Sequence, residues 1–381
     1  MNEGPAIAGP DGRAEALLAR YERAGYRRVA PAMLQPAEPF LDLSGEELRQ
    51  RIFLTTGPDG RELCLRPDLT IPVSRDYLAS AEAGDAAGFC YLGPVFRHRD
   101  DAPAEFLQAG IEAFGREDTA AADAEMLALG LEAVSHYGVD APEIRMGDVG
   151  LFAALIAALD LAPAWRRRLL KDFNRAVSLA EDLERLVKAS VQERPEYQGV
   201  LTALAGSDPR AAHALVTDLL SIAGISTVGG RSVGEIADRF LEQAALGASS
   251  GLPQATRALI ERFLTIHGDP DECADALRTL AREEKLDIGA SLDLFESRTG
   301  FLAAQSVEVA RIRFSTGYGR GLDYYSGLVF ELHDAKRRVA GQLVAGGRYD
   351  GLLTRLGAAA PIPAIGFAVW IDRLAGIGGA P

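Results

Sequence analysis

The sequence contains few cysteines and no long apolar run, and both absences narrow the classes of protein it can belong to. Its three cysteines, Cys64, Cys90 and Cys273, are an odd number without Cys-x-x-Cys spacing. They therefore encode neither a disulfide framework nor a cysteine zinc site, and we expect buried thiols. No run approaches the roughly 18 apolar residues of a membrane span, and Met1 to Arg13 shows no leader pattern. These absences predict a cytoplasmic protein that does not associate with membranes.

Positive charge is also scarce. The chain has 40 Lys and Arg against 54 Asp and Glu, a net charge of −14, which argues against broad affinity for nucleic acid. The dense basic cluster from Arg166 to Lys171 has helical spacing and is typical of a solvated helix face. The chain lacks a P-loop, and its five histidines lack metal-ligand spacing, so we predict no metal site.

The apolar pattern divides the 381 residues into a β-rich part and a helical part. Strand patterns occur before about residue 150 and again after about residue 310, whereas the stretch between them has an almost wholly helical pattern. We therefore predict an α+β core formed by residues 1–162 and 252–381. Residues 163–251 are predicted to form a helical insertion in that core.

The segment from Ser315 to Glu331, STGYGRGLDYYSGLVFE, is dense in residues that suit a binding site. It contains four glycines, Arg320, and three tyrosines that include Tyr324 and Tyr325. Glycine lets a backbone approach a ligand closely, and arginine and tyrosine supply donors and amphipathic rings. The segment therefore predicts the floor of a small-molecule pocket. A glycine-rich β-hairpin with ordinary strand tyrosines is the alternative.

Two further segments place polar side chains next to predicted strands. A hairpin predicted around Gly57 leads into Arg66-Pro67-Asp68-Leu69-Thr70, where Pro67 is expected to open a helix. Phe106 to Phe114 is expected to return antiparallel to the strand before it, with Gln108, Gly110 and Glu112 on one face. Those side chains either meet solvent or line a pocket.

These segments together resemble the catalytic core of the class II aminoacyl-tRNA synthetases, and within them the histidyl-tRNA synthetases. RGLDYYSGLVFE resembles that family's histidine-recognition motif, and LRPDLT, FLQAGIEAFG and GGRYDGL occur in the family's order. The resemblance implies an antiparallel sheet flanked by helices, in a dimer formed through about Tyr26 to Pro36. It also implies that Arg97 is the motif 2 arginine and Arg373 the motif 3 arginine.

The departures from the synthetase pattern concern ATP and tRNA. The segment between Arg97 and Gln108 is shorter than the loop that synthetases fold over ATP, and Arg99 stands where they carry a glutamate. Trp370 replaces a glycine that leaves room for the nucleotide, so its indole is expected to fill that space. The alternative is that Trp370 faces the other way and packs in the core. No residue is assigned a catalytic role, and no cofactor is expected.

The anticodon-binding domain of the synthetases is also missing. What remains resembles the ATP phosphoribosyltransferase regulatory subunits, which the short-form catalytic subunit requires in the first step of histidine biosynthesis. The resemblance implies a noncatalytic subunit that binds no tRNA, a homodimer within a hetero-oligomer with that catalytic subunit. A truncated histidine-activating ligase and a free-standing histidine sensor are the alternatives.

The amino-acid pocket of the synthetases is nearly intact, and by resemblance its ligand is L-histidine, the expected effector. The α-amino group would meet Asp68, Thr70 and Gln108, and the carboxylate would meet Arg97 and Arg320. The imidazole would meet Glu112, Tyr324 and Tyr325. The alternatives are that Asp68 and Thr70 cap a helix and that Gln108 and Glu112 lie on a solvated strand face.

Overall fold

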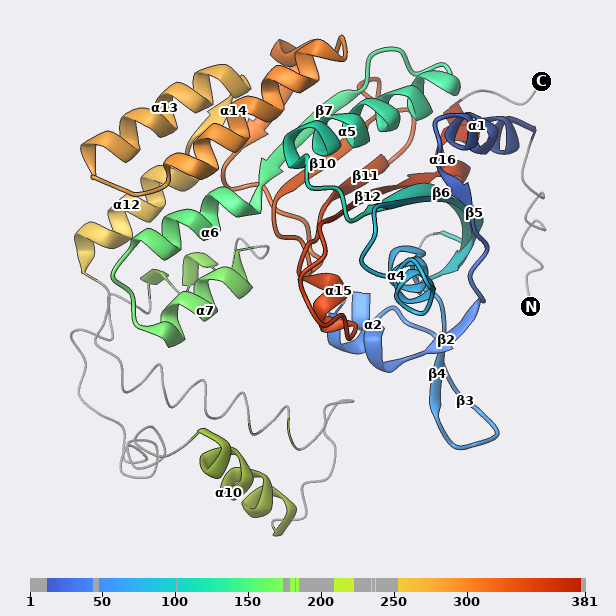
Figure 1. Cartoon of the computed structure of the whole chain (residues 1–381), viewed down its shortest axis with the longest axis horizontal. Coiled ribbons are helices and arrows are strands. Elements are labelled where there is room, and N and C mark those ends of the chain that lie inside the picture. Colours follow the sequence, from blue (N-terminus) through green and yellow to red (C-terminus); the bar gives the residue numbers. More distant parts are fainter. Residues whose placement is uncertain are drawn as a thin grey trace. The chain divides into compact units, whose positions relative to one another are not determined.

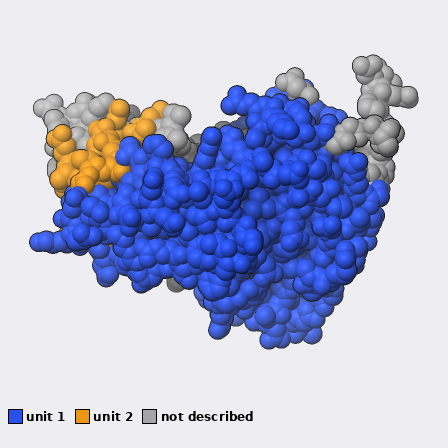
Figure 2. Space-filling model, turned by 90° about the horizontal axis from the view of Figure 1, so that it is seen from above, with its two compact units in different colours: residues 1–154, 263–381 blue, residues 155–262 orange. Residues whose placement is uncertain are grey.

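The structure is a computed structural model that describes residues 12–43, 48–100, 102–173, 179–181, 183–184, 209–222, 253–377 and the single positions 234 and 237. The chain divides into two compact units, residues 1–154 with 263–381, and residues 155–262 (Figure 2). Helices α7 (Pro163–Asp172) and α10 (Pro209–Ile222) belong to the second unit. Much of the predicted insertion, 163–251, lies outside the described residues, so its boundaries stay a prediction.

A mostly antiparallel sheet of nine described strands forms the centre of the first unit (Figure 1). The strand order is β1-β5-β6-β12-β11-β10-β7-β9-β8, and β1 with β5 and β7 with β9 are parallel pairs. In that order the strands are Arg27–Arg28, Ala87–Phe96, Glu105–Phe114, Ala364–Trp370, Gln342–Arg348, Leu328–His333, Glu143–Asp148, Ile312–Ser315 and His267–Gly268. This sheet confirms the predicted α+β class and the predicted antiparallel return of β6 on β5.

Helices cover one face of the sheet in two layers (Figure 1). Helix α1 (Gly12–Arg23) packs on β5 and β6, and α5 (Thr119–His136) packs on β10, β11 and β12. A Cβ on Gly130 of α5 would lie 3.2 Å from Val344 Cγ1, so the helix lies close against the sheet. Helix α14 (Gly289–Ala304) packs on α5, and α13 (Pro270–Glu283) packs on α14.

The other face carries the apolar cluster that surrounds the candidate site. Helices α2 (Glu38–Leu43), α4 (Thr70–Leu78) and α15 (Leu352–Arg355) contribute to this cluster. Next to it, β2 (Leu34–Pro36), β4 (Glu62–Leu65) and β3 (Leu54–Thr56) form a small antiparallel sheet, which confirms the predicted hairpin. The helix expected to open at Pro67 begins at Thr70 instead.

The structure describes four further short elements. They are α6 (Val149–Ala158), α12 (Gln254–Leu264), the 3-10 helix η1 (Val309–Arg311) and α16 (Ile371–Ile377). Strands β9 and β10 each pair with β7 and not with each other, so the hairpin alternative for Ser315 to Glu331 is wrong. The three cysteines are free and buried, as predicted. None of the described helices is long and apolar enough to cross a membrane.

Candidate functional site

A cavity of about 330 Å³ lies on the sheet face opposite α5, where neighbouring strands carry small side chains. Ala345 of β11 and Ala368 of β12 are register partners that both line it, and Gly110 of β6 continues the row. A Cβ on Gly110 would lie 2.4 Å from the hydroxyl oxygen of Tyr91. The small residues thus leave space above the sheet, and the Tyr91 ring fills the end of the row.

The structure brings the predicted binding residues together around this cavity. They come from the start of α4, the end of β5, strand β6 and the segment before β10, which are far apart in sequence. The cavity is lined by seven of the eight predicted side chains, namely Asp68, Thr70, Arg97, Gln108, Arg320, Tyr324 and Tyr325. The solvated-face alternative is wrong for Gln108, which is 1% exposed.

Two of these side chains carry buried polar atoms with no hydrogen-bond partner among the described residues. Both amide atoms of Gln108 and the Oδ2 atom of Asp68 are in this state. Asp68 Oδ1 accepts a hydrogen bond from the Ile71 backbone N–H at 3.1 Å, so Asp68 also caps the start of α4. Burial raises the pKa of Asp68. Because an unmade buried hydrogen bond costs roughly 1–3 kcal/mol, these atoms indicate a place for a polar ligand.

Glu112, the eighth predicted residue, is fully buried and does not line the cavity. Its carboxylate accepts hydrogen bonds from the hydroxyls of Thr70 at 2.7 Å, Tyr91 at 3.1 Å and Tyr349. Burial raises the pKa of Glu112 to about 8 against the opposing effect of these bonds. Because Thr70 and Tyr349 point their hydroxyl hydrogens at Glu112, their oxygens can offer lone pairs to the cavity. Glu112 is thus placed to act on a ligand through them.

The two tyrosines that hold Glu112 were not among the residues predicted from the sequence. Tyr349 lies in the GGRYDGL motif, which was a usable signal, whereas nothing near Tyr91 distinguished it from a buried strand residue. The space for the carboxylate comes from Gly366 on the neighbouring strand β12. A Cβ there would lie 1.8 Å from Glu112 Oε2, so only glycine fits at this position.

The two arginines predicted to bind a carboxylate differ in what they already contact. Arg320 donates to the Tyr325 hydroxyl and, at 3.2 Å, to Glu331 Oε1. Although burial opposes it, a hydrogen bond from His333 and the charge of Arg320 lower the pKa of Glu331 to about 2. Arg97 uses its Nε atom to donate to the Pro67 carbonyl at 2.6 Å and forms no ion pair among the described residues. Arg97 is therefore the better placed of the two to receive a ligand carboxylate.

The far end of the cavity is where the synthetase pattern predicted ATP. Trp370 lines the cavity together with Gly366 and Ala368, which alternate along the same face of β12, so the alternative that Trp370 faces the other way is wrong. The Arg373 guanidinium lies 5.4 Å from the centre of the Trp370 ring. Burial and the charges of Arg99 and Arg97 lower the pKa of Arg373 to about 10. The indole occupies space at this end of the cavity.

No group of three or more potential metal-ligating side chains is found in the described part of the chain. The residues that line the cavity offer hydrogen-bond acceptors, on Asp68 and Gln108, and the guanidinium group of Arg97, which suit an organic ligand that carries charges of both signs.

Comparisons with known proteins show the family to which this chain belongs. The family model described as histidyl-tRNA synthetase matches residues 11–229 and 212–374. A relative from Brucella canis, named ATP phosphoribosyltransferase regulatory subunit, is 45% identical over 351 residues, which cover 91% of this chain and 92% of the relative. A relative of the same name from Brucella melitensis biotype 1 is also 45% identical, over 91% of each chain.

Solved structures show the same fold. The ATP phosphoribosyltransferase regulatory subunit/histidyl-tRNA synthetase from Bacillus halodurans C has a TM-score of 0.66 at 21% identity, with coverage of 100% of this chain and 84% of that one. The histidine–tRNA ligase subunit from Alicyclobacillus acidocaldarius has a TM-score of 0.57 at 25% identity, with coverage of 99% and 96%.

Proposed function

Because this chain belongs to the histidyl-tRNA synthetase-like family of ATP phosphoribosyltransferase regulatory subunits, we propose that it regulates that enzyme without catalysing a reaction itself. Its partner is the short-form catalytic subunit, which acts in the first step of histidine biosynthesis. The chain forms a homodimer within the hetero-oligomer, works in the cytoplasm and binds no tRNA. L-histidine binds in the cavity and inhibits the partner by feedback.

The observation that carries the histidine proposal is the set of unpaired polar atoms on residues that line the cavity. An α-ammonium group would pair with Asp68 Oδ2 and the amide oxygen of Gln108, both of which lack partners among the described residues. The α-carboxylate would pair with Arg97 and, after a shift of its present contacts, with Arg320. The imidazole would contact Tyr324, Tyr325 and the hydroxyl oxygens that Glu112 orients. Each polar part of histidine thus has a partner of suitable charge.

The ligase alternative requires space for ATP beside the amino acid. Trp370 lines that end of the cavity, and its side chain is only 5% exposed. A noncatalytic role therefore fits the cavity better than adenylate formation. Feedback inhibition requires in addition that histidine bind one state of the complex more tightly than another, since equal binding shifts no equilibrium.

Calorimetry with Asp68→Asn tests the ligand. This change removes the charge that would face the α-ammonium and nearly keeps the shape, so histidine binding is expected to weaken by about 1.5–3 kcal/mol, the range for a hydrogen bond to a charged group. Asp76→Asn, at an exposed position of helix α4, which follows Asp68, is the matched control and is expected to bind as the wild type does. Undiminished affinity in Asp68→Asn would place the effector site elsewhere.

The partner is tested separately by co-purification with the short-form catalytic subunit of the same host. We expect turnover of that subunit to rise when this chain is added and to fall again when histidine is added. Equal turnover with and without this chain would contradict the regulatory role, whatever calorimetry shows about histidine.

A further inference from the structure

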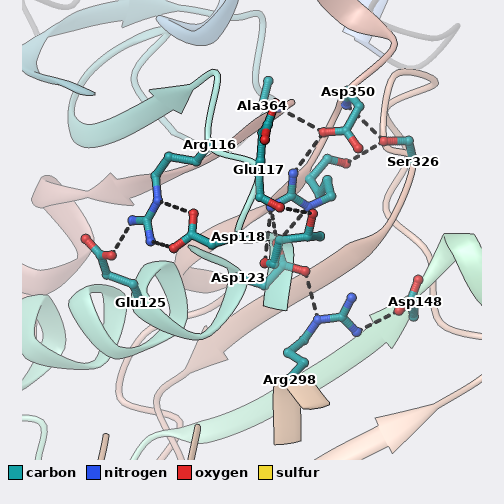
Figure 3. A network of polar contacts seen from close by, with 12 residues as sticks. Arg116, Glu117, Asp118, Asp123, Glu125, Asp148, Arg298, Ser326, Asp350 and Ala364 are labelled. Carbon is teal, nitrogen blue, oxygen red and sulfur yellow. Dashed lines mark hydrogen bonds and ion pairs between the residues drawn. The ribbon is translucent and has the colours of Figure 1, made fainter. Parts of the chain in front are cut away.

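A chain of buried ion pairs lies on the face of the sheet that α5 covers, opposite the cavity, and Figure 3 shows the contacts within it. Its members are Asp123 on α5, Arg298 on α14, Asp148 at the end of β7 and Arg348 at the end of β11. None is more than 3% exposed, and none lines the cavity. Each buried charge is thus paired with one of opposite sign, which is the condition for keeping charges inside a protein, and Arg348 pairs in addition with the partly exposed Asp350 at 2.9 Å.

Arg298 on α14 bridges α5 and the end of β7. It donates from Nε to Asp123 Oδ2 at 2.8 Å and from Nη1 to Asp148 Oδ2 at 2.7 Å (Figure 3). Arg348 donates from Nε to the other oxygen of Asp123 at 2.7 Å. The contacts therefore run without a gap from the end of β11, through α5 and α14, to the end of β7.

The segment that lines the cavity closes this path into a ring. We call residues 320–327, which include Arg320, Tyr324 and Tyr325, the ligand loop. Its Ser326 N–H donates to the Arg348 carbonyl at 2.8 Å, and its Gly327 carbonyl accepts from the Val149 N–H at 2.9 Å. The end of the ligand loop is thus held between β11 and the first residue of α6.

The same point anchors a helix that leads out of the first unit. Asp148 Oδ1 accepts from the Gly150 N–H at 2.8 Å, while its Oδ2 atom receives Arg298. Helix α6 runs from Val149 to Ala158, and the division between the two units falls after Ala154. A displacement of the ligand loop would therefore act directly on Val149, the first residue of α6, and this helix extends past Ala154 into the second unit.

From this ring we propose that Arg298 is a positioning residue that couples ligand binding in the cavity to α6 and, along that helix, to residues 155–262. The ligand in this coupling is histidine, so the inference rests on the proposed function. Arg298 touches neither the ligand loop nor the cavity, and it acts by fixing Asp148 and Asp123. Without it, Asp148 stays buried with no ion pair among the described residues and Asp123 keeps only Arg348, so the ligand loop and the start of α6 lose their common support.

Hydrogen exchange read by mass spectrometry on the full chain tests the coupling. In the wild type, histidine is expected to slow exchange in the ligand loop and also to change it in α6 and in residues 155–262. In Arg298→Met, histidine still slows exchange in the loop, with a similar Kd by calorimetry, but the change in α6 is lost. Arg298→Lys, which keeps the charge, is expected to restore part of it.

Arg278→Met is the matched control, because Arg278 also pairs with two carboxylates, Asp293 and Glu296, but on the exposed side of α13 and α14. It is expected to respond to histidine as the wild type does. Should Arg298→Met fail to fold, Asp148→Asn breaks the same contact with a smaller change and takes its place. An α6 response that is equal in wild type and variant, or is missing from a wild type that binds histidine, overturns the inference.

The coupling can also be tested without histidine. This test distinguishes an error in the proposed coupling from an error in the proposed ligand. Without histidine, Arg298→Met is expected to speed exchange in both the ligand loop and α6 relative to wild type and to Arg278→Met. Faster exchange in only one of the two segments would refute the coupling even if calorimetry found no histidine binding. Absence of binding in the wild type, in contrast, would refute the proposed ligand alone.

Discussion

Replacing Gln108 by leucine is expected to stabilise the ligand-free protein and to weaken histidine binding. Gln108 is 1% exposed, and neither atom of its amide has a partner among the described residues. Removing a buried unpaired polar group recovers roughly 1–3 kcal/mol, and leucine has a similar volume, so little cavity forms. We therefore expect the free energy of unfolding to rise by about 1–3 kcal/mol. Histidine binding should weaken by about 1.5–3 kcal/mol, because the amide oxygen would no longer meet the ammonium.

The chain offers a control of the same residue type and burial with its amide satisfied. Gln35, 6% exposed, donates to the Ala32 carbonyl at 2.8 Å and accepts from Arg75 at 2.9 Å. Gln35→Leu is therefore expected to lower the free energy of unfolding, by roughly 1–3 kcal/mol. The change in the free energy of unfolding should therefore be positive for Gln108→Leu and negative for Gln35→Leu.

Urea unfolding followed by tryptophan fluorescence measures the difference. The chain has two tryptophans, Trp370 in the first unit and Trp165 in the second, so a Trp165→Phe background reports on the first unit alone. Calorimetry with histidine on the same proteins measures the change in the free energy of histidine binding. If Gln108→Leu destabilises the protein as much as Gln35→Leu does, the amide of Gln108 already makes hydrogen bonds in the ligand-free state. The unpaired amide would then no longer support a ligand site.

Three further predictions concern Glu112, Trp370 and the absence of adenylate formation. Because the pKa of Glu112 is raised to about 8 in the folded protein, the folded state keeps a proton that the unfolded chain loses above its ordinary pKa of 4.5. Between those two pKa values this group should lower the free energy of unfolding by about 1.4 kcal/mol for each unit of rising pH. Urea unfolding of Glu112→Gln should lack that contribution. Equal pH slopes in wild type and variant would contradict the raised pKa of Glu112. Trp370→Gly should cost about 3–5 kcal/mol of stability and admit ATP in a binding titration. The wild type should show no histidine-dependent exchange of pyrophosphate into ATP, and exchange well above background would refute its noncatalytic role.

Local pattern was sufficient for much of the sheet and for the direction of its side chains. The alternation in β6 placed Gln108 and Glu112 on one face, and the structure confirms that both point to the same side of the sheet. The alternation could not show that other side chains would bury the carboxylate of Glu112. The covering hydroxyls of Tyr91 and Tyr349 lie 21 and 237 residues away in sequence, and periodicity carries no information about such contacts.

The start of α4 shows a different limit. Proline at the first helical position is a common start signal, and it predicted a helix from Pro67. In the structure Asp68 instead accepts from the Ile71 N–H, and the helix begins at Thr70. Proline is a common helix start signal, but the side chain of Asp68, two residues before Thr70, caps the helix and sets a later start.

The position of β12 in the sheet determines how long β6 lacks its partner strand during synthesis on the ribosome. Strand β12 pairs with β6, yet about 250 residues separate the end of β6 from its start. At roughly 5–20 residues per second, synthesis of that interval takes about 12–50 s. During this time the edge of β6 exposes unpaired backbone groups and apolar side chains, which are a template for aggregation. A nascent chain of this protein should therefore depend on a chaperone until β12 emerges.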